Sequence, residues 1–133
     1  MSGKSRYLEN ALLDHVLGGG DYARPATVYV ALFTAAPTDT GGGTEVSGGS
    51  YARAAITNNA TNFPAASGGV KSNAVAVNFA SASASWGSIV AVAIFDALTG
   101  GNLLFWATLT TPRTVSTGDA PSFSIGALQF TED

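Results

Sequence analysis

The sequence predicts an all-β protein, an antiparallel β-sandwich or jelly-roll-like barrel, with one short helix near its N-terminus. Three observations predict this fold. Short segments rich in β-branched and aromatic residues recur along the chain, turns rich in Gly, Asp and Asn separate them, and no helical pattern is interleaved among them. The 133 residues suit one domain, which we expect to span residues 1–133.

The helix is expected at about residues 5–17. Apolar residues recur every four positions at Leu8, Leu12 and Val16, which gives the segment one apolar stripe. Ser5 is a residue type that caps helix N-termini, and three consecutive glycines follow the segment and stop it. A helix this short is marginally stable alone, so its stripe must pack on the sheet or on another subunit.

Six later segments have the character of strands. Each is rich in β-branched, aromatic or alternating apolar residues and is bounded by turn formers. The run 88–97 is almost continuously apolar, which indicates a central strand, and the TGGN turn that follows joins it to 103–110 as a hairpin. Residues 38–49 and 58–72 are expected to be loops. The six predicted strands are 27–35, 51–57, 74–80, 88–97, 103–110 and 122–130.

The charge content is low and excludes several functions. Charged residues make up 11% of the chain, against roughly 25% in an average domain, so the surface is expected to be covered by other protein. The six basic residues are scattered, which argues against nucleic-acid binding. The apolar runs fall short of the roughly 18 residues that span a bilayer, which argues against a membrane partner. The N-terminal region does not resemble a signal peptide, so synthesis is expected in the cytoplasm.

The sequence predicts no catalytic, cofactor or metal site. It contains one histidine, His15, and no cysteine, which disfavours both a catalytic base and a structural zinc site. Pairs of acidic residues near turns could bind calcium, but turn-forming carboxylates that bond their own backbone are the favoured interpretation. These acidic residues are Asp39, Glu45, Asp96 and Asp119.

Several aromatic residues could form a flat platform for a sugar. Aromatic side chains near strand ends more often anchor a core or a subunit interface, and that interpretation is favoured here. The candidates for the platform are Trp86, Trp106, Tyr22, Tyr29 and Tyr51.

Two long segments resemble a known family. They are YVALFTAAPTDTGGGTEVSGGSYAR at 29–53 and WGSIVAVAIFDALTGGNLLFWATLTTPRTVSTGDAPSFSIGAL at 86–128. Both are similar to segments of small virion proteins of tailed phages, often labelled tail-fibre-like, and the helix with its LLDHVLGGG ending also fits. The resemblance implies a β-rich virion component without enzyme activity.

These observations together predict a non-enzymatic structural component of a tailed-phage virion, either a tail-fibre-like appendage or a capsid decoration (cement) protein. Expected partners are the chain itself, as a homotrimer, and virion proteins such as the major capsid or tail proteins. The loop 38–50 is long and is expected to reach a neighbour or the host. Alternatives are a module that binds a host surface glycan and, less favoured, a small hydrolase. Candidate interface residues are Leu8, Leu12, Val16, Tyr22, Tyr51, Thr44 and Val46.

Overall fold

The regular secondary structure consists mostly of antiparallel strands. A computed structural model describes residues 3–132, and in it every paired strand runs antiparallel to its partner. One helix lies near the N-terminus, before the first long strand. The predicted all-β class with one short N-terminal helix is therefore confirmed.

A six-stranded sheet forms the main layer. The long strands β2, β7 and β8 lie side by side at its centre, and β1 pairs with the outer edge of β8. The other edge of β2 is shared by β4 along its first half and β3 along its second half. The strands are β1 (Gly3–Lys4), β2 (Thr27–Ala35), β3 (Thr44–Glu45), β4 (Ala54–Thr57), β7 (Gly87–Phe95) and β8 (Leu103–Val115).

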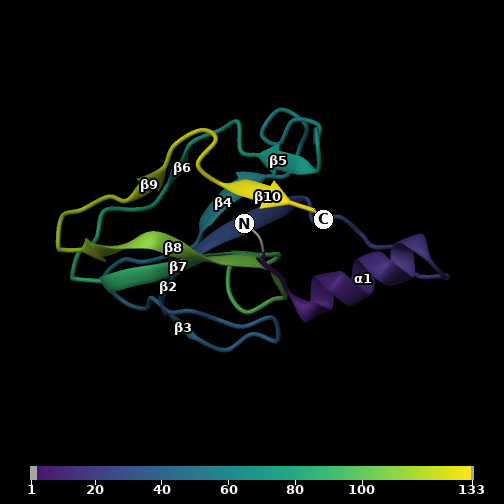
Figure 1. The fold of residues 1–133 in the computed structure, drawn as a ribbon. Coiled ribbons are helices and arrows are strands. Elements are labelled where there is room, and N and C mark those ends of the chain that lie inside the picture. The colour runs from purple at the N-terminus through teal and green to yellow at the C-terminus, as the bar shows by residue number, and fades with distance from the viewer. Residues whose placement is uncertain (1–2, 133) are drawn as a thin grey trace.

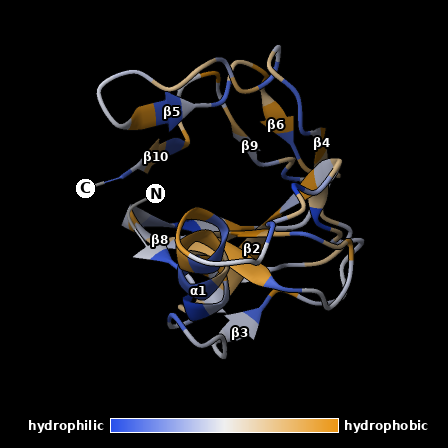
Figure 2. Ribbon diagram, turned by 90° about the vertical axis from the view of Figure 1, so that its right-hand side faces the viewer, coloured by the Kyte–Doolittle hydropathy of each residue, from blue (hydrophilic) through white to orange (hydrophobic). Residues whose placement is uncertain are grey.

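Two short ribbons form the second layer. Strand β5 (Val70–Ser72) pairs with β10 (Gln129–Thr131), and β6 (Val77–Asn78) pairs with β9 (Ser122–Phe123). Figure 2 shows both ribbons on one side of the main sheet, and loops connect them to it. The molecule is therefore a sandwich with one complete sheet and a second layer made of two small pieces.

The helix α1 (Arg6–Val16) begins where the sequence predicts. The Ser5 hydroxyl accepts a hydrogen bond from the Leu8 backbone N–H at 3.1 Å and donates one to the Leu103 carbonyl, so this cap also ties the helix to β8. The first turn of α1 packs on the sheet, and Figure 1 shows the other end extending away from the strands.

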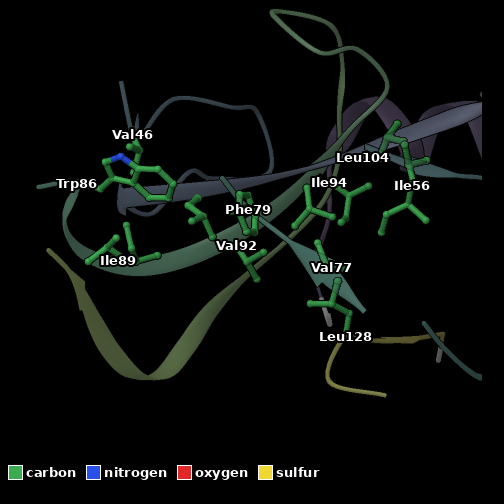
Figure 3. Close-up of a cluster of buried hydrophobic side chains, with 14 of the residues drawn as sticks. Val46, Ile56, Val77, Phe79, Trp86, Ile89, Val92, Ile94, Leu104 and Leu128 are labelled. Atoms are coloured by element: carbon green, nitrogen blue, oxygen red, sulfur yellow. The ribbon is translucent and has the colours of Figure 1, made fainter. Parts of the chain in front are cut away.

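The main core fills the space between the two layers. Val30 and Leu32 of β2 and their neighbours on β7 face the ribbons, because alternate residues of a strand share one face. Val77 and Leu128 reach the same cluster from the second layer (Figure 3). The core residues labelled in Figure 3 are Val46, Ile56, Val77, Phe79, Trp86, Ile89, Val92, Ile94, Leu104 and Leu128.

The opposite face of the main sheet carries small residues at its centre. Ala31, Ala91 and Ala93 are fully buried there, with Phe33 beside them. Pro37 is buried too, and the loop that follows it bonds back to the sheet. The loop after β2 therefore covers this face closely, and alanines leave room for it.

The central strands follow the prediction closely. Strand β2 matches 27–35, and β7 lies within one or two residues of 88–97. The predicted hairpin is confirmed, because β7 pairs with β8 across the turn, although β8 continues to Val115. Continuous apolar runs at the centre of a sheet carry the clearest pattern, because both of their faces are buried.

The outer segments differ from the prediction. The expected strand 122–130 is wrong, because Gly126 has φ +81° and breaks the segment into β9 and β10. The expected strand 74–80 shortens to β6, and 51–57 is extended only over β4. Strands β3 and β5 lie within the predicted loops 38–49 and 58–72, because such two- or three-residue strands are set by their partners and carry little sequence pattern.

Candidate functional site

The far end of α1 carries an exposed apolar ridge. Leu13, Val16 and Leu17 are 59%, 73% and 74% exposed, and we call these three residues the helix ridge. Leu8, on the first turn, is 4% exposed and lies in the core. The helix therefore uses its first half to anchor itself and presents aliphatic side chains on its second half.

An apolar groove lies beside the same helix. Its volume is about 420 Å³, and α1, the main sheet and β10 surround it. Rings from the two layers form part of the wall: Phe105 and Phe130 meet edge to face at 5.0 Å, and Phe63 meets Phe130 at 6.1 Å. We call this feature the apolar groove. Its lining is Leu8, Leu12, Tyr22, Arg24, Pro25, Val28, Asn58, Asn59, Ala60, Phe63, Ala65, Lys71, Ile94, Leu104, Phe105 and Phe130.

The charges of the apolar groove are basic. Arg24 and Lys71 line it, and the described residues of its lining include no carboxylate. The whole chain has six basic residues and a net charge of −3. The groove is thus locally positive on a molecule that is acidic as a whole.

The structure gathers four of the predicted interface residues around this region. Leu8, Leu12 and Tyr22 line the apolar groove, and Val16 belongs to the helix ridge. Burial raises the pKa of the Tyr22 hydroxyl, and the Tyr22 backbone N–H donates to Nδ1 of His15 at 3.1 Å. Whether these residues contact a partner stays a prediction.

The other three predicted interface residues lie elsewhere. Thr44 is exposed on β3, whereas Val46 is 6% exposed and packs in the main core. Tyr51 is half-buried, and its hydroxyl accepts from the Leu32 backbone N–H at 3.0 Å. Within the chain, Tyr51 and Val46 therefore act as core residues, and an interface role for the three is still a prediction.

A polar cluster missed by the sequence analysis lies beside Tyr51. The Glu45 carboxylate accepts from both Nε (2.9 Å) and Nη2 (2.8 Å) of Arg53, and from the Tyr51 hydroxyl at 2.7 Å. Arg53 also donates to the carbonyls of Ala97 and Gly100 at 2.8 Å. Alternate residues of a strand share a face, so the predicted strand 51–57 places Tyr51 and Arg53 together. Nothing in the sequence assigns Glu45 to them.

The electrostatics of this cluster follow from its burial. Burial alone would raise the pKa of Glu45, but the hydrogen bonds from Arg53 and Tyr51 outweigh it and hold that pKa below its usual range. Burial and the adjoining Glu45 carboxylate raise the pKa of Tyr51. The guanidinium carbon of Arg53 lies 3.7 Å from the centroid of the Phe95 ring, which adds a cation–π contact. Because the oxygens of Glu45 are occupied, the cluster joins strands and turns and is poorly suited to proton transfer.

The acidic residues considered as calcium ligands bond to their own surroundings. Asp96 accepts from the Asn102 backbone N–H at 2.7 Å, and Asp119 accepts from the Ser116 backbone N–H at 2.9 Å. Asp39 accepts from Nε1 of Trp106 at 2.9 Å, across the loop that covers the sheet. Across residues 3–132, no three His, Cys, Asp or Glu side chains are grouped to hold a metal ion.

Two of the aromatic residues considered for a sugar platform, Trp86 and Tyr51, pack against each other. Trp86 is 5% exposed, its Nε1 donates to the Gly49 carbonyl at 2.8 Å, and its ring meets Tyr51 edge to face. Both rings therefore pack inward, which counts against their role in glycan binding.

Among residues 3–132, the one helix, α1, has neither the length nor the apolar character of a membrane span.

Comparison with known families gives a match over nearly the whole chain. The family described as "Podophage GP4 fiber I protein gp80" matches residues 3–131, which include α1, both layers and the apolar groove. A search of curated proteins found no match. The resemblance to tail-fibre-like virion proteins is confirmed, and the chain belongs to the podophage GP4 fiber I protein gp80 family of phage fibre structural proteins.

Proposed function

We propose that the chain is a non-enzymatic subunit of a virion fibre that assembles with copies of itself, as a homotrimer, and with neighbouring virion proteins. The family match over residues 3–131 carries this proposal. The subunit is made in the host cytoplasm and joins the particle during assembly. Of the two virion positions that the sequence left open, the fibre position agrees with the family description, and capsid decoration becomes the alternative outcome of the test.

The surface chemistry supports an assembling subunit. Only 11% of the residues are charged, so few ions must lose water when a neighbour covers the surface. The helix ridge adds exposed aliphatic side chains, and removing their surface from water on association lowers the free energy. Virion proteins occur in many copies and associate through symmetric contacts, for which such surfaces are suited.

The polar chemistry supports a structural role. The Glu45, Asp96 and Asp119 carboxylates each accept hydrogen bonds from groups of the same chain. A catalytic carboxylate instead needs free acceptor capacity beside a substrate. These contacts hold turns and strands together, which is what a rigid building block requires.

Quantitative mass spectrometry of purified particles tests the position. We expect the chain in about a few tens of copies per particle, at a fibre in a reconstruction of the virion. Hundreds of copies on the capsid surface would assign a decoration role instead. Complete absence of the chain from purified particles would refute the proposal.

Light scattering coupled to size-exclusion chromatography tests the self-association. The purified full-length chain should elute with three times the mass of one chain, 13.4 kDa. A mass that stays at one chain at all accessible concentrations would contradict self-assembly in the absence of other virion proteins.

A further inference from the structure

We propose that the helix ridge of one copy docks into the apolar groove of a second copy of this chain. This inference rests on the proposed function, because it assumes that copies assemble, and it names the surfaces that meet. The ridge is Leu13, Val16 and Leu17, and the apolar groove lies at the base of the same helix.

The two surfaces match in shape and polarity. Residues three apart lie on one side of a helix, so Leu13 and Val16 share a face of α1. Leu17, the C-cap residue, directly follows Val16 and extends the apolar surface past the end of the helix. An apolar helix row that enters an apolar groove is a recurring mode of protein recognition. The groove offers aromatic and aliphatic walls, and the Phe105, Phe130 and Phe63 rings hold one another in place before any partner arrives.

The charges around the two surfaces are complementary. Asp14 and Asp21 are exposed near the end of α1 that carries the ridge, and the Asp21 carboxylate, 99% exposed, lies 3.8 Å from Nδ1 of His15. Arg24 and Lys71 line the groove. A copy that inserts its ridge brings carboxylates towards cations, which favours this encounter over one between two ridges. An apolar partner without acidic residues would lack this complementarity.

The groove cannot receive the ridge of its own chain. Leu8 and Leu12 line the groove, and the ridge begins at the next residue, Leu13, and continues to the end of the same helix. Figure 1 shows this end of α1 pointing away from the strands, so the ridge cannot fold back onto the groove wall to which it is joined. The ridge must therefore come from another molecule, and a second copy carries the required residues.

Complementary variants of the full-length chain test the docking. The ridge variant Leu13→Glu with Val16→Glu should weaken self-association at least about tenfold, measured by sedimentation equilibrium, because two charges would enter an apolar site. The groove variant Arg24→Glu with Ala65→Glu should weaken it similarly, because it repels the acidic side of the ridge. All four positions are exposed, so folding measured by circular dichroism should be retained.

Mixing the two variants gives the decisive measurement. A ridge variant retains an intact groove and a groove variant retains an intact ridge, so the mixture should form hetero-oligomers through the one remaining contact. The matched control Ile125→Glu alters an exposed apolar residue in a turn away from the groove and should leave self-association unchanged. Unchanged self-association in both variants, or no hetero-oligomer on mixing, would overturn the inference.

The same variants separate this inference from the proposed function. If the ridge variant self-associates as the native chain does and still enters virions, the docking inference fails while the fibre role stands. If the native chain is absent from particles, the proposed function fails regardless of how copies associate in solution.

Discussion

Asn73 is the buried polar residue on which the C-terminal segment depends. Its side chain is almost fully buried, and Nδ2 donates to the carbonyls of Val75 at 2.8 Å and Ser124 at 3.1 Å. Its Oδ1 accepts from the Leu128 backbone N–H at 3.0 Å. One amide therefore joins the segment before β6 to both sides of the turn between β9 and β10.

Replacing Asn73 by alanine should lower the free energy of unfolding by at least about 2 kcal/mol, because buried backbone groups lose their partners. Urea denaturation followed by circular dichroism measures this loss. The matched control is Asn78→Ala, which alters an exposed asparagine on β6 and should cost much less. Equal losses for the two variants would show that the buried amide contributes nothing special.

Glu45 should make stability depend on pH. Its folded-state pKa lies below the ordinary value of 4.5, so the folded state binds fewer protons than the unfolded state near that pH. The stabilisation is complete above 4.5 and is lost as the pH falls through the lower folded-state pKa. Glu45→Gln should cost about 2 kcal/mol at neutral pH, and this difference should shrink in acid. Urea titrations at several pH values measure it, and a difference independent of pH would contradict the assignment.

At the scale of elements, the loop between β2 and β3 is shaped by glycines in the left-handed region. Gly42 and Gly43 have φ +79° and +76°. A Cβ at Gly43 would lie 2.6 Å from the Ala35 carbonyl oxygen, whereas a Cβ at Gly42 would meet nothing within 4 Å. This loop lies tightly against its own sheet, and its expected contact with a neighbour or host stays a prediction.

These two glycines form a matched pair for measurement. Gly42→Ala should cost about 1 kcal/mol, because only the backbone conformation is strained. Gly43→Ala should cost about 2 kcal/mol more, because the added methyl group also meets the backbone of β2. Thermal unfolding of the two variants tests the order, and a larger loss for Gly42→Ala would refute this account of the loop.

The sequence predicted the elements with strong local patterns and missed those set by distant contacts. The apolar run of β7, the β7–β8 hairpin and the Ser5-capped helix each carry their signal within a few residues. The β5–β10 ribbon depends on residues 70 and 131 meeting. Strand β5 lies in a predicted loop, and the pattern at 122–130 could not show that its end pairs with β5. Pairings between segments far apart in sequence leave little trace in either one.

The same distinction holds for the site. The leucine stripe of α1 identified Leu8, Leu12 and Val16, but the pattern could not show that the first is buried and the last exposed. The groove could not be predicted, because its walls come from both layers. Asn73 and the Glu45–Arg53 pair were missed for the same reason, since their partners lie in other segments.

At the scale of the whole molecule, one core joins the two layers. Residues of β2 and β7 pack against Val77 of β6 and against Phe79 and Leu128, which flank β6 and β10, within a single cluster (Figure 3). Each ribbon has only two short strands, and such pieces are not stable alone. The ribbons should therefore unfold together with the main sheet, as expected of the single domain predicted over 1–133.

Denaturation of the full-length chain tests this cooperativity. Tryptophan fluorescence and far-ultraviolet circular dichroism should give coincident unfolding curves, because loss of the shared core removes the support of both layers. Separate midpoints would indicate that the ribbons and the main sheet unfold independently, and would contradict a single cooperative unit.

The described ends of the chain lie together. Lys4 on β1 and Glu132 after β10 form an ion pair with 2.5 Å between Nζ and Oε2, and Figures 1 and 2 both show the two ends as neighbours. Peptides or reporter domains fused to either end would therefore emerge from one spot. A domain fused before β1 and a domain fused after β10 would therefore be attached at nearly the same place on the molecule.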